Sequence, residues 1–233
     1  MSKTSRKDGD SPMDVSKALL ARRTVRAFRP DPVPRETVAA ILSAALHAPS
    51  WANTQPWEVY VATGATLERL RTASLERTHE GVPGEPDLPR PKEWPEACRE
   101  RTRGLSGGRA KLTATAADDT TFQRDFLENN RRFFGAPLVV YLCLDRSLTP
   151  WSIFDLGLLA QSVMLAAQDQ GVDSAIAVNL VVYPDLVRAE VGIPEELLVL
   201  IGIALGYADP KDPEGEFRSS RRTLEEAVRF CDI

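Results

Sequence analysis

Residues 21–28 read ARRTVRAF and residues 48–57 read APSWANTQPW, and these two stretches decide how the chain is interpreted. The first stretch holds Arg22, Arg23, Thr24 and Arg26 within five positions. A guanidinium offers a rigid fork of donors that matches a phosphate, and a nearby hydroxyl can complete such a cradle. The stretch therefore predicts a phosphate-binding segment, although arginines at the end of a helix also complement its dipole without a ligand.

The second stretch is a loop that delivers two amide side chains, Asn53 and Gln55, just before an apolar segment. Amides both donate and accept hydrogen bonds, so they suit the mixed edge of a flat heterocycle. The alternative is an ordinary helix-to-strand loop, because Pro, Ser and Asn are common turn residues.

Together the two stretches resemble the FMN-dependent nitroreductase family, in its nitrobenzoate-reductase-like branch. That family carries R-R-S/T-x-R/K-x-F followed by A-P-S-x-x-N-x-Q-P-W, and Thr24 and Arg26 are permitted variants. Residues 206–209, GYAD, resemble the G-Y-x-D motif found near the family's C-terminal end. The resemblance covers nearly the whole chain after Ser11.

The composition is that of a globular protein, with 233 residues, 43% hydrophobic and 27% charged. We expect a polar, flexible tail over residues 1–11 and one domain over residues 12–233. A net charge of −4 argues against a nucleic-acid partner. No apolar run approaches the roughly 18 residues of a membrane span, so we expect a cytoplasmic protein without a membrane partner.

Three cysteines without a C-x-x-C spacing and two histidines indicate neither a disulfide framework nor a metal site. The G-x-S-x-G pattern of residues 104–108 matches a hydrolase nucleophile elbow. That elbow needs a buried strand before it and a histidine after it. Charged residues precede Ser106 and no histidine follows it, so we reject a hydrolase.

Hydrophobic periodicity predicts helices and strands. Together with the resemblance, these elements imply an α+β fold with a mixed, largely antiparallel sheet of four or five strands flanked by helices. The expected strands are 57–62, 138–144, 174–179 and 197–206, and the expected helices are 12–21, 34–46, 67–77, 122–134, 150–170 and 185–191. The helix 150–170 is apolar nearly all round, so it must be buried on several sides. Its own sheet can cover one side, and either the rest of the chain or a second subunit the other; the family resemblance implies an intertwined homodimer.

Residues 81–119 are rich in proline, glycine and charge, and they are too long for a simple connection. They form a functional lid, an excursion that embraces a partner, or a disordered stretch. We favour a mobile lid over the site, because the resembled family often inserts substrate-shaping helices here. Trp94 either stacks on a substrate or pins this excursion to the body. Its arginines either grip an NADPH phosphate or form a solvated, charged surface.

The resemblance implies positive charge at both ends of an FMN molecule. Arg22 and Arg221 are implied to bind the phosphate, with the Thr24 hydroxyl beside them. Arg23 is implied to contact the phosphate or the ribityl chain. Arg26 is implied to lie near the N1–C2=O edge, where a cation favours the reduced flavin.

The resemblance implies hydrogen bonds from Asn53 to the flavin ring or the ribityl chain. It also implies stacking on the ring by residues of the partner subunit: Pro49, Ser50 and Trp51. The backbone at the end of the strand 174–179 is implied to face the flavin N5 edge through Val178 and Asn179.

No side chain need be catalytic, since hydride chemistry belongs to FMN N5. The resemblance implies NADPH or NADH as electron donor, ping-pong kinetics, and nitroaromatic compounds, quinones or related acceptors as substrates. The alternatives are another flavin reaction on this fold, such as reductive dehalogenation or flavin fragmentation, and a non-catalytic flavin-binding dimer.

Overall fold

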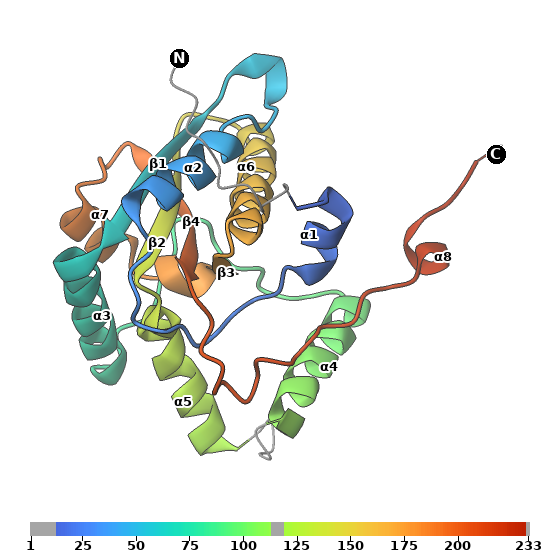
Figure 1. Cartoon of the computed structure of the whole chain (residues 1–233). Helices are drawn as coiled ribbons and strands as arrows, with labels where there is room; N and C mark the ends of the chain where they lie inside the picture. Colours follow the sequence, from blue (N-terminus) through green and yellow to red (C-terminus); the bar gives the residue numbers. More distant parts are fainter. Residues whose placement is uncertain (1–12, 113–118, 232–233) are drawn as a thin grey trace.

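The computed structural model describes residues 13–112 and 119–231, and within these ranges it holds a four-stranded sheet with helices on both faces (Figure 1). The strands lie in the order β1-β2-β4-β3, and neighbouring strands are antiparallel. The expected α+β class is confirmed. The strands are β1 (Trp57–Thr63), β2 (Leu138–Asp145), β3 (Asp173–Ala177) and β4 (Leu197–Gly206).

Strand β2 is central because nearly all of its side chains are apolar and every residue except Asp145 is buried. Successive side chains of a strand point to opposite faces, so β2 contributes to two separate cores. Leu138, Val140, Leu142 and Leu144 belong to one core, and Val139, Tyr141 and Cys143 belong to the other. A strand of this kind needs cover on both faces of the sheet.

Two helical layers provide that cover. On one face, α2 (Arg35–Ala45) packs against α6 (Pro150–Asp169), which also contacts β2 and β3. On the other face, α3 (Gly64–His79) and α7 (Pro184–Val191) pack against each other and against the sheet. The remaining helices are α1 (Val15–Ala21), α4 (Glu96–Leu112), α5 (Thr120–Arg131) and α8 (Leu224–Ala227).

Helix α6 is buried on the side that faces the sheet and open on the other side. Leu156, Leu159 and Val163 lie in the core, whereas Trp151 and Phe154 are each 63% exposed. By length and hydropathy α6 would cross a bilayer, but a core helix of a soluble protein passes the same test. The exposed residues of α6 thus lie in its N-terminal half, whereas residues 158–169 have no exposed side chain.

Several helix boundaries differ from the expected ones, and α1 begins at Val15 rather than at residue 12. Helix α3 begins at Gly64 and extends to His79, so Gly64 starts the helix as well as ending the strand before it. Helix α5 ends at Arg131 rather than at residue 134, because Phe133 and Phe134 adopt positive φ angles of 53° and 59°. Pro12 and the expected tail 1–11 lie outside the described residues.

The stretch 81–119 has more structure than its composition indicated. Its middle is helix α4, which contains three glycines at positions 104, 107 and 108. A Cβ on Gly108 would lie 3.0 Å from the Phe217 ring, so this glycine permits close packing of α4 on the C-terminal segment. Before α4, Asp87 pairs with buried Arg188 and accepts a hydrogen bond of 2.7 Å from the Val199 amide.

The C-terminal segment leaves the body of the molecule. After β4 the chain runs extended past α4, and α8 then projects away from the sheet and its helices (Figure 1). A capping box between Thr223 and Glu226 defines the start of α8. Leu224 and Phe230 on this arm are 57% and 62% exposed.

Candidate functional site

The arginine segment lies in an extended conformation along the edge of β3. The Val25 amide donates to the Ser174 carbonyl at 3.0 Å, and Thr24 forms an isolated parallel bridge with Ser174. Val25 is buried in the core. Because side chains alternate along an extended chain, burial of Val25 turns Thr24 and Arg26 to the opposite side.

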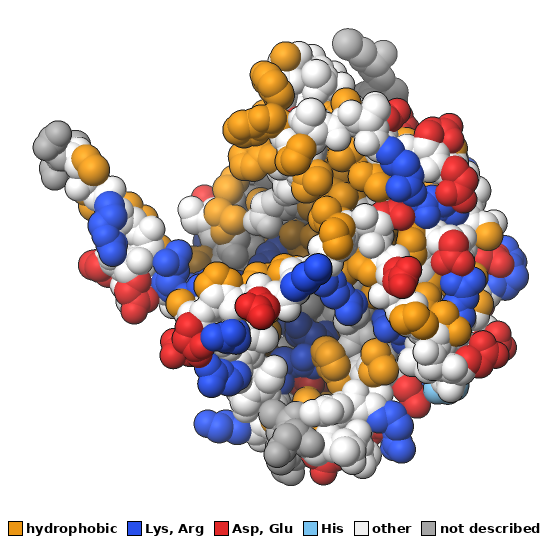
Figure 2. Space-filling model, turned by 180° about the vertical axis from the view of Figure 1, so that it is seen from behind, with side chains coloured by type: hydrophobic (Ala, Val, Ile, Leu, Met, Phe, Trp, Pro, Cys, Tyr) orange, Lys and Arg blue, Asp and Glu red, His pale blue; other side chains and the backbone are white. Residues whose placement is uncertain are grey.

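On that side the segment lines a pocket of about 380 Å³, here named the arginine pocket. Its wall includes four residues of the first motif and a second group from the C-terminal segment, which is nearly two hundred residues away in the sequence. In the view of Figure 2, Lys and Arg side chains surround a hollow in the lower half of the molecule. The polar and charged lining residues are Arg22, Arg23, Thr24, Arg26, Arg218, Ser219 and Arg221.

The charges in the arginine pocket repel one another. Burial lowers the pKa of Arg22, and the nearby Arg221 lowers it further. Burial and then repulsion from Arg109 lower the pKa of Arg26 to about 10, while Glu214 and Asp212 act in the opposite direction. Within the described residues, Arg22, Arg26 and Arg221 form no ion pair with a carboxylate. Crowded cations of this kind favour an anionic ligand.

A buried ion pair that no sequence motif indicated holds the wall of the arginine pocket beside Arg26. Arg109 of α4 donates to both carboxylate oxygens of Glu214, at 2.6 Å and 2.9 Å, and also lies 4.7 Å over the Phe126 ring. Both side chains are nearly buried, at 9% and 13% exposure. Asn129 of α5 donates to the Arg26 carbonyl at 2.8 Å. Helix α4, helix α5 and the C-terminal segment thereby meet beside Arg26.

The loop of residues 49–55 lies elsewhere, at the N-terminal end of α6. The Trp51 amide donates to Asp155 at 3.2 Å, and the Trp51 ring packs edge-on against Trp151 at 6.0 Å between centroids. The 3-10 turn η1 (Trp51–Asn53) brings Asn53 to a φ of 57°. The residues predicted to face the flavin ring do not line the arginine pocket of the same chain: Pro49, Ser50, Trp51 and Asn53.

The predicted strand 174–179 ends at Ala177, so placing Val178 and Asn179 in a strand was wrong. They begin the 3-10 turn η3 (Val178–Val181). The Asn179 amide donates to Asn130 at 3.0 Å, and its oxygen accepts from Arg90 at 2.9 Å. The Asn179 backbone carbonyl accepts from Arg131 at 3.4 Å instead of pairing with β4.

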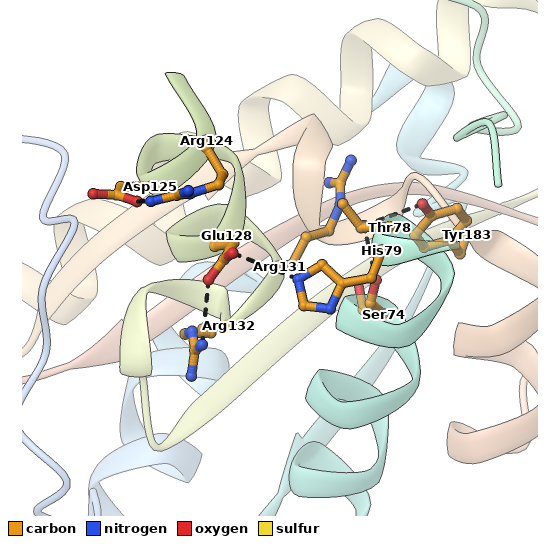
Figure 3. Close-up of polar contacts among 9 residues, drawn as sticks. All are labelled: Ser74, Thr78, His79, Arg124, Asp125, Glu128, Arg131, Arg132 and Tyr183. Atoms are coloured by element: carbon orange, nitrogen blue, oxygen red, sulfur yellow. Dashed lines mark hydrogen bonds and ion pairs between the residues drawn. The ribbon is translucent and has the colours of Figure 1, made fainter. Parts of the chain in front are cut away.

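A polar cluster between α3 and α5 supports this turn (Figure 3). Arg131 is 6% exposed and reaches from α5 to the Thr78 hydroxyl of α3 at 2.9 Å, while its other end donates to the Asn179 carbonyl at 3.4 Å. The Tyr183 hydroxyl lies 3.2 Å from that of Thr78. Burial lowers the pKa of Arg131. These bonds therefore hold the turn that carries Asn179 in place.

The outer rim of the same cluster is an ion-pair group that links the two helices. Glu128 of α5 lies 3.4 Å from Arg132 and 3.5 Å from His79 of α3 (Figure 3). Hydrogen bonds from Arg132 and then from His79 lower the pKa of Glu128.

Trp94 is half exposed and borders two further hollows. One, of about 570 Å³, is lined by Trp94 together with Val178 and the inner face of α6. The other, of about 840 Å³, lies between α4 and the C-terminal segment. In the part of the chain that the structure describes, no three His, Cys, Asp or Glu residues are arranged to hold a metal ion.

Comparisons with known proteins agree on one family. Residues 19–207 match the Nitroreductase family. The nitrobenzene nitroreductase of Ectopseudomonas oleovorans is 38% identical over 221 residues, which cover 93% of this chain and 96% of that protein. The solved structure of the FMN-dependent nitroreductase NfnB from Mycobacterium smegmatis in complex with NADPH superposes with a TM-score of 0.88, at 35% identity, covering 93% of this chain and 97% of that one. The FMN- and NADPH-dependent NfnB from Sphigopyxis sp. strain HMH gives a TM-score of 0.90 at 30% identity, covering 95% and 100%.

Proposed function

This chain belongs to the nitroreductase family, and we propose that it is an FMN-dependent oxidoreductase that reduces nitroaromatic compounds with electrons from NADPH. The single observation that carries the proposal is the arginine pocket, in which unpaired guanidinium groups from both ends of the chain meet. The similar proteins supply the class of reaction, and the pocket supplies the reason why this chain can hold the cofactor.

The arginine pocket fits the phosphate of FMN. A phosphate dianion would relieve the repulsion between Arg22 and Arg221, and Thr24 adds a hydroxyl donor. Arg23 serves the phosphate or the adjoining ribityl chain. Arg26, held by Asn129 and flanked by the Arg109–Glu214 pair, is the cation for the N1–C2=O edge of the ring. That placement favours an anionic reduced ring.

We assign no catalytic role to a side chain, because bound FMN supplies the hydride chemistry at its N5 atom. The chain binds, orients and shields the reactants. The proposed kinetics are ping-pong, in which the oxidised nucleotide leaves before the nitroaromatic compound or quinone occupies the same place. Val178 and Asn179 face the N5 edge, and the bonds of Asn179 to Asn130 and Arg90 keep this turn in one position.

We also propose a homodimer, because one chain leaves large apolar side chains uncovered. Trp51, Trp151 and Phe154 are all more than 60% exposed around the N-terminal half of α6. Figure 2 shows hydrophobic side chains gathered on the upper part of this face. Patches of this kind mark association surfaces. In the dimer, the partner subunit's loop supplies the residues for the flavin ring: Pro49, Ser50, Trp51 and Asn53.

The remaining parts of the proposal concern the domain and its surroundings. Residues 12–233 act as one flavin-binding domain, and residues 81–119 form the lid that shapes the acceptor site, with Trp94 at its edge. The described part of this lid is anchored through Asp87 and α4. We expect the protein to work in the cytoplasm.

The test is a visible spectrum of the purified protein followed by anaerobic addition of NADPH. We expect flavin absorbance that bleaches with NADPH and returns on addition of a nitroarene. A bound flavin that stays oxidised with both NADPH and NADH would contradict the proposed reaction and favour dehalogenation, flavin fragmentation or a non-catalytic role. A colourless protein that FMN cannot reconstitute would contradict the assignment of the arginine pocket.

A further inference from the structure

The hollow of about 840 Å³ between α4 and the C-terminal segment, here named the α4 pocket, shares a wall with the arginine pocket. The shared wall consists of one residue of α4 and four of the C-terminal segment: Leu105, Phe217, Arg218, Ser219 and Arg221. The α4 pocket is within the size range of small-molecule sites in proteins. A second ligand would therefore lie directly beside the phosphate of a bound flavin.

The α4 pocket contains two arginines that the arginine pocket lacks, Arg101 and Arg222. Arg101 contacts only the Cys98 sulfur at 3.2 Å, and Arg222 only the Glu226 carbonyl at 3.4 Å, among the hydrogen bonds formed by the described residues. Neither guanidinium pairs with a carboxylate there, although Glu100 and Glu226 also line the pocket. The Glu226 carboxylate accepts from the Thr223 amide in the cap of α8.

Other arginines of the same helix behave differently. Arg99 and Arg103 both pair with Glu96, and Arg109 pairs with Glu214. These three arginines are engaged in holding α4 together and in place. Arg101, which lies between them in the sequence, is free to bind an anion that enters the α4 pocket.

The α4 pocket also offers aromatic surface. Trp94, which is 51% exposed, and Phe217 both line it, together with Leu105. Aromatic side chains beside arginines suit a ligand that joins a planar base to a phosphate. The adenosine end of a nicotinamide dinucleotide has this chemistry, and NADPH differs from NADH by a 2′-phosphate, a group that arginine side chains recognise in other folds.

We propose that the α4 pocket receives the adenosine end of NADPH, with Arg101 and Arg222 on its 2′-phosphate and Trp94 against its base. The inference rests on the proposed function, because it assigns the electron donor to a place beside the flavin. Arg101 and Arg222 are then specificity-determining residues, since they contact the one group that distinguishes NADPH from NADH.

The test measures KM for both nucleotides in the Arg101→Ala/Arg222→Ala variant of the flavin-loaded protein. We expect KM for NADPH to rise about tenfold, as for the loss of a charge-assisted contact, and KM for NADH to stay within about twofold. Arg103→Ala is the matched control, because it removes an arginine of the same helix that is paired with Glu96. This control should leave the ratio of the two KM values unchanged.

A binding measurement without turnover accompanies the kinetics. In calorimetric titrations, adenosine 2′,5′-bisphosphate should bind the original protein at least about tenfold more tightly than adenosine 5′-monophosphate, and the double variant should lose this difference. Equal KM changes for NADPH and NADH, or an unchanged preference for the bisphosphate, would overturn the inference. So would a change of oligomeric state without a change in the KM ratio. Failure of the proposed function differs from these outcomes, because the flavin would then be reduced by neither nucleotide.

Discussion

In the arginine pocket, one chain brings together residues from both of its ends, and the buried Val25 holds the first group on the sheet. The loop of residues 49–55 has the opposite character. Its Trp51 is 64% exposed. The Trp51 ring lies against Trp151 and its backbone amide donates to Asp155 in α6, outside that pocket. One chain therefore assembles the arginine pocket by itself, whereas the loop that we propose for the flavin ring lies outside that pocket.

The largest expected effect comes from removing arginines that line the arginine pocket. Replacing Arg22 and Arg221 together by Ala should weaken FMN binding by at least about 100-fold, because each charge-assisted hydrogen bond contributes about 1.5–3 kcal/mol. Fluorescence titration of the flavin-free protein measures the change in Kd. Arg69→Ala is the control, since Arg69 pairs with Glu190 on the outside of α3. An unchanged FMN affinity in the double variant would contradict the placement of the FMN phosphate in the arginine pocket.

The second-largest effect is expected from a charge placed on the exposed apolar surface around Phe154. Phe154→Asp places a charge in the centre of the uncovered apolar surface, where burial of a phenylalanine stabilises an interface by about 2–3 kcal/mol. We expect the dimer to dissociate at least about 30-fold more readily in analytical ultracentrifugation. Leu127→Asp adds the same charge to an exposed leucine of α5 and should leave the dimer intact. A Phe154→Asp protein that sediments as a dimer would place the interface elsewhere.

A third substitution tests the ion pair between Arg109 and Glu214 that supports the arginine pocket. Glu214→Ala leaves the nearly buried Arg109 without its carboxylate, and we expect a loss of about 2 kcal/mol in the free energy of unfolding. Urea unfolding of the flavin-free protein measures this loss. Because the Arg109–Glu214 pair holds the wall of the arginine pocket beside Arg26, FMN affinity should fall as well. Full stability with unchanged FMN affinity would show that α4 does not support the pocket.

The smallest effect concerns the polar cluster under Asn179. The pKa of Glu128 is lowered in the folded protein, so its charge adds stability above the unfolded carboxyl pKa of about 4.3, and this contribution is lost as pH falls through the folded pKa. Glu128→Gln should therefore lower Tm slightly at pH 7, and the difference should shrink at a pH below about 4.3. An equal change in Tm at both pH values would show that the carboxylate charge is not responsible.

Local pattern predicted the parts of the molecule that depend on local physics. The apolar run of β2 and the helical pattern of α2 depend on the local side-chain pattern alone, and both elements are present in the structure. The resemblance predicted that Arg221 belongs with Arg22, and both line one pocket, whereas the Arg109–Glu214 pair had no sequence signal because its partners meet only through the fold.

Tertiary contacts also explain the predictions that differed. Val178 favours a strand by propensity, but the bonds of Asn179 to Asn130 and Arg131 turn the chain there. The glycines of α4 argue against a helix, yet the ion pairs of Glu96 and the packing of Gly108 on Phe217 stabilise one. Neither set of contacts can be predicted from the spacing of residues in the sequence.

The most direct test of a site built by two chains is complementation in a mixed dimer. One chain carries Arg22→Ala, the other carries Asn53→Ala, and the two are co-expressed with different affinity tags so that only mixed dimers are purified. If the partner's loop completes each site, one of the two sites combines an intact arginine pocket with an intact loop, and half of the sites should bind FMN with the original affinity. If each chain supplies both parts of its own site, every site carries one damaged part. A mixed dimer in which no site binds FMN with the original affinity would contradict the account.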